Sequence, residues 1–340
     1  MSAAALSHNK KQAQIREVGL RPVRLRQDLG AVADLIELAF GPTMDAGGRA
    51  AVREMRTLSR SGPILWFLAG LDSAVQALMR GFVWIDPITG RLIGNVSIYP
   101  AGYDDLWVIA NVAVHPDFRR RGIAEEMMRA SLDFAIQQKS SGVALQVEAD
   151  NDGAQRLYHK LGFRTLRGFT RWRRHPYLDP PLPLTQMPDI TYLTHREWKA
   201  EFALAEQLRP ESQGGMGWLR PTQPREFRPK FSFGRAFGLR NEEHWVVRDP
   251  ENDHRVLATL RTDSRFGSTY TRADLLVAPA YQGELEWPLL NFAIRYAADQ
   301  RRGLMIEHPS DDENATLLFS ENRFETARRL IHMLWTPSPK

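Results

Sequence analysis

The hydrophobic positions of the first half alternate between a helical period and a strand period. Val32, Leu35 and Ile36 recur at helical spacing, and Asp28 is placed to cap the helix they predict, which we expect to end near Phe40. Short apolar runs bounded by turn formers predict strands between the helices. The predicted strands cover residues 20–25, 77–85, 92–99, 106–114, 143–149 and 163–174, and the predicted helices cover residues 28–40, 49–59, 122–139 and 151–161.

The run from Leu106 to Val114 is apolar on both faces. By alternation, one face carries Val108, Ala110, Val112 and Val114, and the other carries Ile109 and Ala113. A strand with apolar residues on both sides is covered on both sides, so the pattern predicts a central strand of a sheet. The run leads directly into an arginine-rich turn and then into an amphipathic helix.

A proline-rich segment separates two halves that partly repeat one pattern. Residues 175–188 contain Pro176, Pro180, Pro181, Pro183 and Pro188, a density that excludes a regular helix or an inner strand and predicts a stiff linker. Beyond it, strands are expected at residues 190–193, 244–248, 256–262, 273–277 and 303–307, and helices at 197–208, 286–300 and 314–319. We therefore expect a flexible tail over residues 1–19, a first domain over 20–174, the linker over 175–188 and a second domain over 189–340.

Composition limits the classes of protein and of site. The chain has 340 residues, of which 43% are hydrophobic and 25% are charged, as in soluble globular proteins. It contains no cysteine, which excludes disulfides, zinc–thiolate sites and an acyl-enzyme on sulfur. No run approaches the roughly 20 apolar residues of a membrane span, and residues 1–11 lack the apolar run of a secretory signal. We expect a cytoplasmic protein with no membrane partner and no metal site.

An arginine-rich turn joins the central strand to the following helix as Arg119-x-x-Gly122-x-Ala124. The first turn of a helix presents unpaired backbone N–H groups at the positive end of the helix dipole, which suits a phosphate. Gly122 and Ala124 lack bulk, so a ligand can approach the backbone, and Arg119, Arg120 and Arg121 add positive charge around it. An isolated arginine run is more often a solvated surface. Between a buried strand and an amphipathic helix, this run predicts a pyrophosphate site.

Two motifs at matching spacing resemble the GNAT superfamily of acetyltransferases. One is the Arg-x-x-Gly-x-Ala loop after a Val-x-Pro strand end, and the other is Asn151…Ala154…Leu157-Tyr158…Leu161-Gly162-Phe163. The resemblance covers residues 20–174. It implies an α/β fold of two GNAT-like (acyl-CoA N-acyltransferase) domains, with a mixed central sheet flanked by helices.

The resemblance also implies a cosubstrate, acetyl-CoA, lying between the strands at 106–114 and 143–149. The implied cofactor-binding residues are Val112, Ala113, Val114, Arg119, Arg120, Arg121, Gly122, Ile123, Ala124, Asn151 and Tyr158. Tyr158 matches the family's tyrosine that faces the thioester sulfur. It is the expected general acid, because a phenol of ordinary pKa about 10 is a fair match to an alkyl thiolate. Its alternative role is a ring packed in the core.

The general base stays open among several residues. The family's glutamate position falls on Gln146, which is not a carboxylate. Glu148 and Asp150 share its strand face by alternation, and Asn111 can position a water. Each has an alternative as a structural or solvated polar group, and the chemistry also permits an amine that arrives neutral. Tyr158, Glu148 and Asn111 are the candidate catalytic residues.

The second half provides an internal control for the loop motif. Segment 277–287 aligns with segment 114–124, but the residues that matter differ. The replacements are Leu285 for Gly122, Trp287 for Ala124, Glu284 for Arg121 and, further along, Phe319 for Tyr158. Bulky and acidic residues would block and repel a pyrophosphate, so we expect a degenerate GNAT-like domain that keeps the fold without the cofactor site. Its aromatic residues Trp218, Phe227, Phe231, Phe233 and Phe237 line an acceptor cleft or form local core.

The expected activity is that of an acyl-CoA-dependent N-acyltransferase (EC 2.3.1 type). It would move an acetyl group from acetyl-CoA to a small-molecule or peptide amine by direct transfer, without a covalent intermediate. A non-catalytic acyl-CoA-binding regulatory protein is the alternative, because no base is obvious. The net charge of +5 is too mild to indicate a nucleic-acid partner, and the sequence predicts no particular oligomer.

Overall fold

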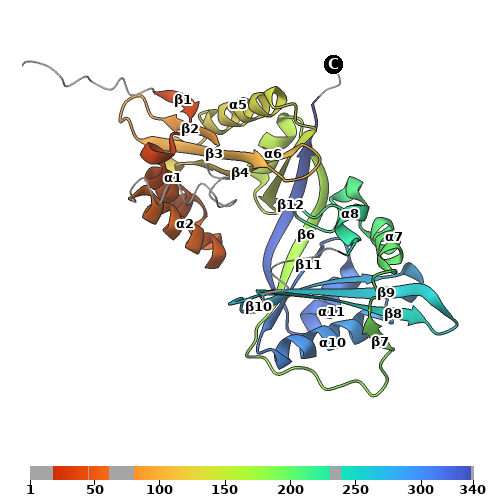
Figure 1. The fold of residues 1–340 in the computed structure, drawn as a ribbon. Coiled ribbons are helices and arrows are strands. Elements are labelled where there is room, and N and C mark those ends of the chain that lie inside the picture. Colours follow the sequence, from red (N-terminus) through yellow and green to blue (C-terminus); the bar gives the residue numbers. More distant parts are fainter. Residues whose placement is uncertain (1–17, 45, 61–79, 230–238, 338–340) are drawn as a thin grey trace, which may run out of the picture. The chain divides into compact units, whose positions relative to one another are not determined.

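The computed structural model describes residues 18–44, 46–60, 80–229 and 239–337, which belong to two compact units (Figure 1). The first unit comprises Met1–Leu145 with Trp335–Lys340, and the second comprises Gln146–Leu334. Within the described ranges, every helix is too short or too polar to cross a membrane. Several predictions fall outside the described residues, namely those for residues 1–17 of the tail, residues 77–79 of the second strand, and Phe231, Phe233 and Phe237.

A mixed sheet with helices on both faces forms the first unit. The strand order is β1-β2-β3-β4-β5, antiparallel except for the parallel pair of β4 and β5. Its strands are β1 (Gly19–Pro22), β2 (Gly81–Ile85), β3 (Leu92–Pro100), β4 (Leu106–Val114) and β5 (Gly142–Glu148), which crosses into the second unit after Leu145. Its helices are α1 (Leu25–Phe40), α2 (Ala46–Ser59) and α5 (Ile123–Gln137), with 3₁₀ turns at Gly41–Thr43 and Pro116–Phe118. The predicted central strand is confirmed, because β4 lies between β3 and β5.

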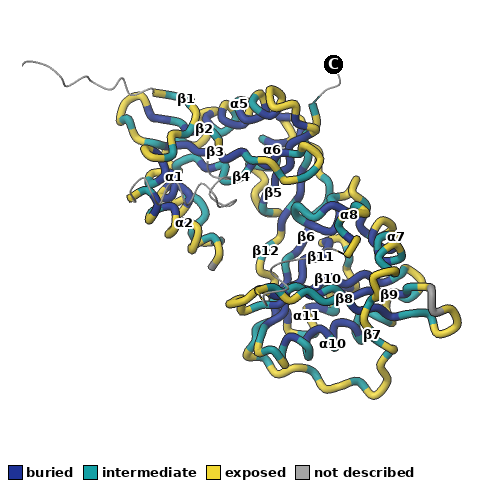
Figure 2. The backbone as a smooth tube through the Cα atoms, viewed as in Figure 1, coloured by how far each residue is buried: buried dark blue, intermediate teal, exposed yellow. Residues whose placement is uncertain are grey.

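The helices of the first unit pack on opposite faces of its sheet. Apolar residues of α1 and α2 contact Val83 and Ile85 of β2. On the other face, a Cβ added to Gly94 of β3 would lie 3.0 Å from Met127 Sδ and 3.1 Å from Ile123 Cγ2 of α5. Strand β3 is buried over most of its length between these layers (Figure 2). The glycine therefore lets α5 approach the sheet closely, which positions the start of that helix.

The expected role of Asp28 as a helix cap is wrong. Helix α1 begins at Leu25, so Asp28 lies inside its first turn. The Asp28 carboxylate instead accepts the backbone N–H of Arg24 at 2.7 Å and pairs with Arg21 at 2.7 Å. Asp28 thus satisfies the N–H of the N-cap residue, as the acidic residue of a capping box does, and not the N–H groups inside the helix that an N-cap side chain accepts.

A β-bulge in β4 breaks the alternation predicted for that strand. Ala110 and Ala113 pair with β3 residues that are only two positions apart, so β4 carries one extra residue there. Asn111 lies in this interval with a left-handed φ of +53°. Beyond the bulge the alternation reverses, so Ala113 joins the face of Ala110 and Val114 joins the face of Ile109.

The strand order continues in the same 12-stranded sheet, after β5, as β12-β6-β11-β10-β9-β8-β7. Only β10 and β11 are parallel among the pairs of these strands with a described register. The strands of the second unit are β6 (Arg164–Arg174), β7 (Ile190–Tyr192), β8 (Arg240–Asp249), β9 (Asn252–Arg265), β10 (Tyr270–Val277), β11 (Gly303–Pro309) and β12 (Glu325–Trp335). Its helices are α6 (Asp152–Lys160), α7 (Trp198–Leu208), α8 (Pro224–Phe227), α10 (Glu286–Asp299) and α11 (Glu313–Glu321), with 3₁₀ turns at Glu211–Gln213 and Pro279–Tyr281.

The elements predicted for the second half are present, and one strand was missed. Apolar residues of α10 and α11 pack on one face of β9, β10 and β11, and a smaller cluster with α7 and α8 covers the other face. Strand β12 was not predicted, and it pairs with β6. Strand β6, the expected last strand of the first half, thus lies between β12 and β11. The domain bounds of 20–174 and 189–340 stay a prediction.

Candidate active site

The backbone edge of β4 beyond its ladder with β5 is the first component of the candidate site. The ladder between β4 and β5 covers only Leu106–Val108 paired with Gly142–Ala144. Strand β4 continues to Val114 with no further described pairing to β5. In this interval the Asn111 carbonyl accepts a hydrogen bond from Asn95 Nδ2 (3.1 Å), and Asn111 Nδ2 donates to Ser97 Oγ (3.3 Å). The Asn111 side chain is therefore tied to β3, where it holds the bulge in place.

The turn after β4 is fixed by hydrogen bonds to its own backbone. His115 Nδ1 accepts the N–H of Asp117 at 3.4 Å, so the imidazole faces the turn. Arg119 Nε donates to the Val114 carbonyl at 3.2 Å, and Arg121 Nη2 donates to the Asp117 carbonyl at 3.1 Å. The turn is thereby held in one shape while its three arginines stay exposed.

Gly122 stands at the start of α5 in a conformation that favours glycine. It is the N-cap residue, with a left-handed φ of +80°. A Cβ placed there would have nothing within 4 Å, so the space over this backbone is open. The helix begins at Ile123, one residue after the predicted start. The open space over the first-turn N–H groups, beside exposed arginines, is an arrangement that suits an anion.

Asn151 and Tyr158 lie in the second unit, on α6. Asn151 caps this helix, because its Oδ1 accepts the N–H of Ala154 at 3.1 Å. The residue is exposed, and its Nδ2 group has no partner within the described chain. Tyr158 is buried, its ring centroid lies 5.9 Å from that of Phe163, and burial raises its pKa to about 12. Its hydroxyl has no hydrogen-bond partner among the described residues, so it is a protonated and uncommitted donor.

The candidate bases near the end of β5 have partners from β12. Glu148 Oε1 accepts from Arg328 Nε at 2.8 Å and Nη2 at 2.5 Å. Gln146, at the family's glutamate position, lies 2.8 Å from His332 Nε2 through its Nε2. Asp150 is exposed. The Glu148 carboxylate is therefore held in an ion pair with Arg328.

His332 is a residue that sequence reasoning missed. It is buried, burial lowers its pKa to about 4, and its ring stacks on that of Phe169 with centroids 4.4 Å apart. Its imidazole is therefore neutral near neutral pH. The ring of Trp218, an expected cleft aromatic, lies 5.3 Å from it, whereas Phe227 is a core residue beside α7. A lone histidine in the apolar run of β12 is usually structural, so the sequence offered no signal for it.

The second half repeats the strand–turn–helix geometry with different chemistry. The 3₁₀ turn Pro279–Tyr281 and the start of α10 at Glu286 fall where the alignment with the first half places them. The Glu286 carboxylate accepts the Gly283 N–H at 2.7 Å. An internal carboxylate thus occupies one N–H of the turn before α10, and Leu285 stands at the glycine position.

Comparisons with known proteins agree with this geometry. Residues 52–163 match the Acetyltransferase (GNAT) family. Mycothiol acetyltransferase of Mycobacterium sp. (strain JLS) is 30% identical over 112 residues, which are 33% of each chain. N-acetylaspartate synthetase of Danio rerio is 31% identical over 96 residues, covering 26% of this chain and 34% of that protein. The chain spans about a third of the length of these curated relatives.

Solved structures resemble the chain over most of its length. The tandem GNAT protein from the clavulanic acid biosynthesis pathway has a TM-score of 0.53 at 16% identity, covering 94% of this chain and 99% of its own. The GCN5-related N-acetyltransferase from Sphaerobacter thermophilus has a TM-score of 0.60 at 15% identity, covering 94% and 97%. At these identities the likeness concerns the fold, and it confirms the predicted GNAT-like α/β architecture.

Proposed function

We propose that the chain transfers an acetyl group from acetyl-CoA to a primary amine, because residues 52–163 match the Acetyltransferase (GNAT) family. The observation that carries the proposal is the start of α5. There Gly122 leaves open space over helix N–H groups, next to three exposed arginines. A pyrophosphate fits this combination of N–H donors and guanidinium groups. The acetyltransferase names of the curated relatives support the same chemistry.

The remaining cosubstrate contacts follow from the backbone edge of β4. Residues Val112, Ala113 and Val114 lie on the part of this strand that β5 does not pair. Those of their N–H and C=O groups that face the unpaired side of the strand would bond the amides of a pantetheine arm, as a neighbouring strand would. Ile123 and Ala124 supply N–H groups of the first helical turn, and the Nδ2 group of Asn151 has no partner among the described residues.

Direct transfer is the mechanism that these residues support. The amine nitrogen would attack the thioester carbonyl, the new C–N bond would form, and the C–S bond would break with the electron pair leaving on sulfur. The amine loses one proton and the thiolate gains one. The pKa of Tyr158, raised by burial to about 12, is well above the 8.5 of an ordinary thiol. Tyr158 would therefore stabilise the thiolate as a hydrogen-bond donor more than as a source of the proton.

A second candidate function is a non-catalytic acyl-CoA-binding protein. The observation that favours it is the pairing of Glu148 with Arg328, together with a glutamine at position 146. Release of free CoA over a panel of amines separates the two functions. We expect saturable acetyl-CoA binding and acceptor-dependent release. Binding without release for every amine tested would support the regulatory protein instead.

Tyr158→Phe is expected to lower kcat by roughly 100-fold, with less than a twofold change in the affinity for acetyl-CoA. The ring and its packing on Phe163 are kept, and only the hydroxyl donor is lost. Steady-state kinetics with an accepted amine would measure the effect. Tyr192→Phe is the matched control, because Tyr192 is 63% exposed and far from α6 in sequence, and it should keep full activity. Unchanged kcat in Tyr158→Phe would leave the tyrosine a packing residue.

One acetyl-CoA is expected to bind per chain. The second half has Leu285 at the glycine position, and Glu286 already accepts the N–H of Gly283 in the turn before α10. Isothermal titration calorimetry or native mass spectrometry would give the stoichiometry. Two tight equivalents per chain would contradict the degenerate assignment of the second copy.

A further inference from the structure

The second unit contains a cavity with a volume of about 390 Å³. The ladder between β10 and β11 covers only Tyr270–Ala273 paired with Gly303–Ile306. Both strands continue beyond it, and the cavity lies at this end, between the starts of α10 and α11. Its lining includes Leu275, Val277 and Phe319 on the apolar side and Arg209 and His308 on the polar side. This size is within the range of small-molecule sites in proteins.

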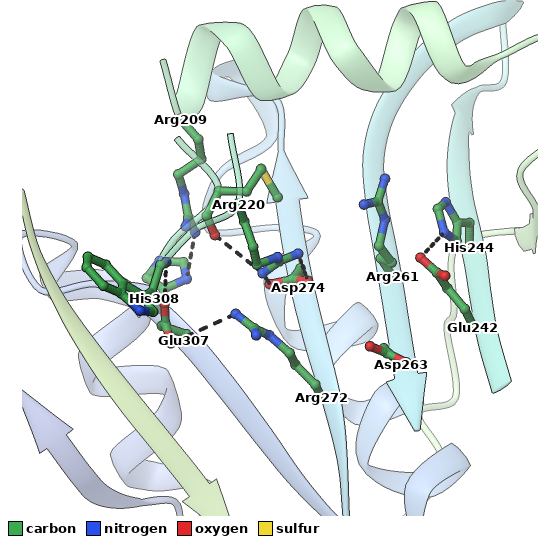
Figure 3. Close-up of polar contacts among 12 residues, drawn as sticks. Arg209, Arg220, Glu242, His244, Arg261, Asp263, Arg272, Asp274, Glu307 and His308 are labelled. Carbon is green, nitrogen blue, oxygen red and sulfur yellow. Dashed lines mark hydrogen bonds and ion pairs between the residues drawn. The ribbon is translucent and has the colours of Figure 1, made fainter. Parts of the chain in front are cut away.

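Arg209 lines this cavity as a buried cation, and some of its hydrogen-bond donors have no partner among the described residues. It follows the last residue of α7 and is 6% exposed. Its Nη2 donates to His308 Nδ1 at 3.1 Å, as Figure 3 shows. Its Nε and Nη1 have no partner in the described part of the chain, and neither atom is completely buried. They therefore face open space, and Arg209 is among the residues that line this cavity.

No carboxylate neutralises Arg209 directly within the described residues. Its hydrogen-bond partner His308 is uncharged, because burial, followed by the charge of Arg209, lowers the pKa of that imidazole to about 4. The nearby carboxylates already have partners. Asp274 holds Arg220 through two hydrogen bonds, and Asp312 accepts from His308 Nε2 at 2.8 Å. Burial of a cation without a paired anion is costly, and a bound anion at the spare donors would remove that cost.

The other lining residues define which anion fits. Glu286 and Glu321 also line the cavity, and burial raises the pKa of Glu286. A phosphate dianion or a pyrophosphate would be repelled by these carboxylates more strongly than a single carboxylate would, and Glu286 already accepts the N–H of Gly283 in the turn before α10. A single carboxylate matches the planar fork of one guanidinium. The apolar lining suits a hydrocarbon body rather than a nucleotide.

We propose that this cavity binds a small organic monocarboxylate, with its carboxylate on Arg209 and its apolar body against Leu275, Val277 and Phe319. This site differs from the proposed acetyl-CoA site in position and in ligand class. It would also give the second half a binding function in place of the pyrophosphate site that its sequence lacks.

Calorimetric titration of the full chain in the absence of acetyl-CoA tests the site. The probes are hexanoate and 3-phenylpropionate, with hexylamine as the charge-reversed control and inorganic phosphate as the competing anion. We expect saturable binding of one carboxylate per chain, no binding of hexylamine, and phosphate at least tenfold weaker. Absence of carboxylate binding, or phosphate that binds as tightly as hexanoate, would overturn the proposal.

Two variants locate the binding. Leu317 lines the cavity on α11 and is 59% exposed, so Leu317→Trp should obstruct the entrance without disturbing the core and weaken carboxylate binding at least tenfold. Leu182→Trp is its matched control at an 84% exposed position outside the lining, and it should bind as the wild type does. Arg209→Lys keeps the positive charge but loses the planar pair of guanidinium donors, so this variant is also expected to bind the carboxylate about tenfold more weakly than the wild type. Wild-type affinity in Leu317→Trp would place the carboxylate elsewhere.

Discussion

Gly122→Glu is expected to reduce acetyl-CoA affinity at least 100-fold. The residue has a φ of +80°, so any side chain there costs about 1–2 kcal/mol in the left-handed conformation. The new carboxylate would lie at the helix start where the pyrophosphate is proposed to bind. Two like charges about 4 Å apart repel by about 4 kcal/mol at an effective dielectric constant near 20. Because a Cβ meets nothing within 4 Å, the fold should survive the change, and equilibrium dialysis can measure the binding directly.

Two controls separate charge from backbone strain in this experiment. Gly122→Ala adds the strain without the charge, and it should weaken binding by no more than about tenfold. Gly102→Glu adds the same charge at another left-handed glycine of the first unit, with φ +88° and open space around its Cβ, and should leave binding unchanged. Wild-type affinity in Gly122→Glu, or equal losses in the two glutamate variants, would remove the proposed pyrophosphate site.

The loop at Gly122 could be predicted because everything that shapes it is close in sequence. The strand end, the 3₁₀ turn and the start of α5 all lie within residues 106–124, and the helix starts within one residue of the expectation. The same local pattern located the turn and helix start of the second half. Helix dipoles, glycine conformation and proline-containing turns act over a few residues, so they leave a readable trace in the sequence.

The features that the sequence did not reveal depend on partners far along the chain. The bulge at Asn111 is set by pairing with β3, and the alternation of β4 alone contains no sign of it. Glu148 meets Arg328, 180 positions away, and Gln146 meets His332, 186 positions away. Both partners come from β12, the strand that was not predicted. The surroundings of the candidate base could therefore not be predicted from the nearby sequence, since they come from the other end of the chain.

Asp274→Asn is expected to lower the free energy of unfolding by about 3–5 kcal/mol. Asp274 is 8% exposed, and its two oxygens accept from Arg220 Nη1 and Nη2 at 2.8 and 2.5 Å (Figure 3). Burial alone would raise the pKa of this carboxyl, but Arg220, with Arg272 and Arg261 nearby, outweighs burial and holds the pKa below its usual range. The neutral amide would leave these buried guanidinium groups without their anion. Losing the anion of a buried ion pair costs more stability than losing that of an exposed pair.

The pH dependence of this loss gives an independent check on its cause. A depressed folded-state pKa means that the stabilisation is fully present above the unfolded pKa of about 3.9 and is lost as the pH falls through the folded value. The gap between wild type and Asp274→Asn in urea unfolding should therefore be constant near neutral pH and shrink below about pH 4. Asp311→Asn is the matched control, because Asp311 is 62% exposed and pairs with Arg167 at 2.9 Å on the surface, so its loss should stay below about 1 kcal/mol. Equal losses for the two variants would mean that burial does not strengthen the Asp274 pair. A pH-independent gap would mean that Asp274 acts through packing and not through its charge.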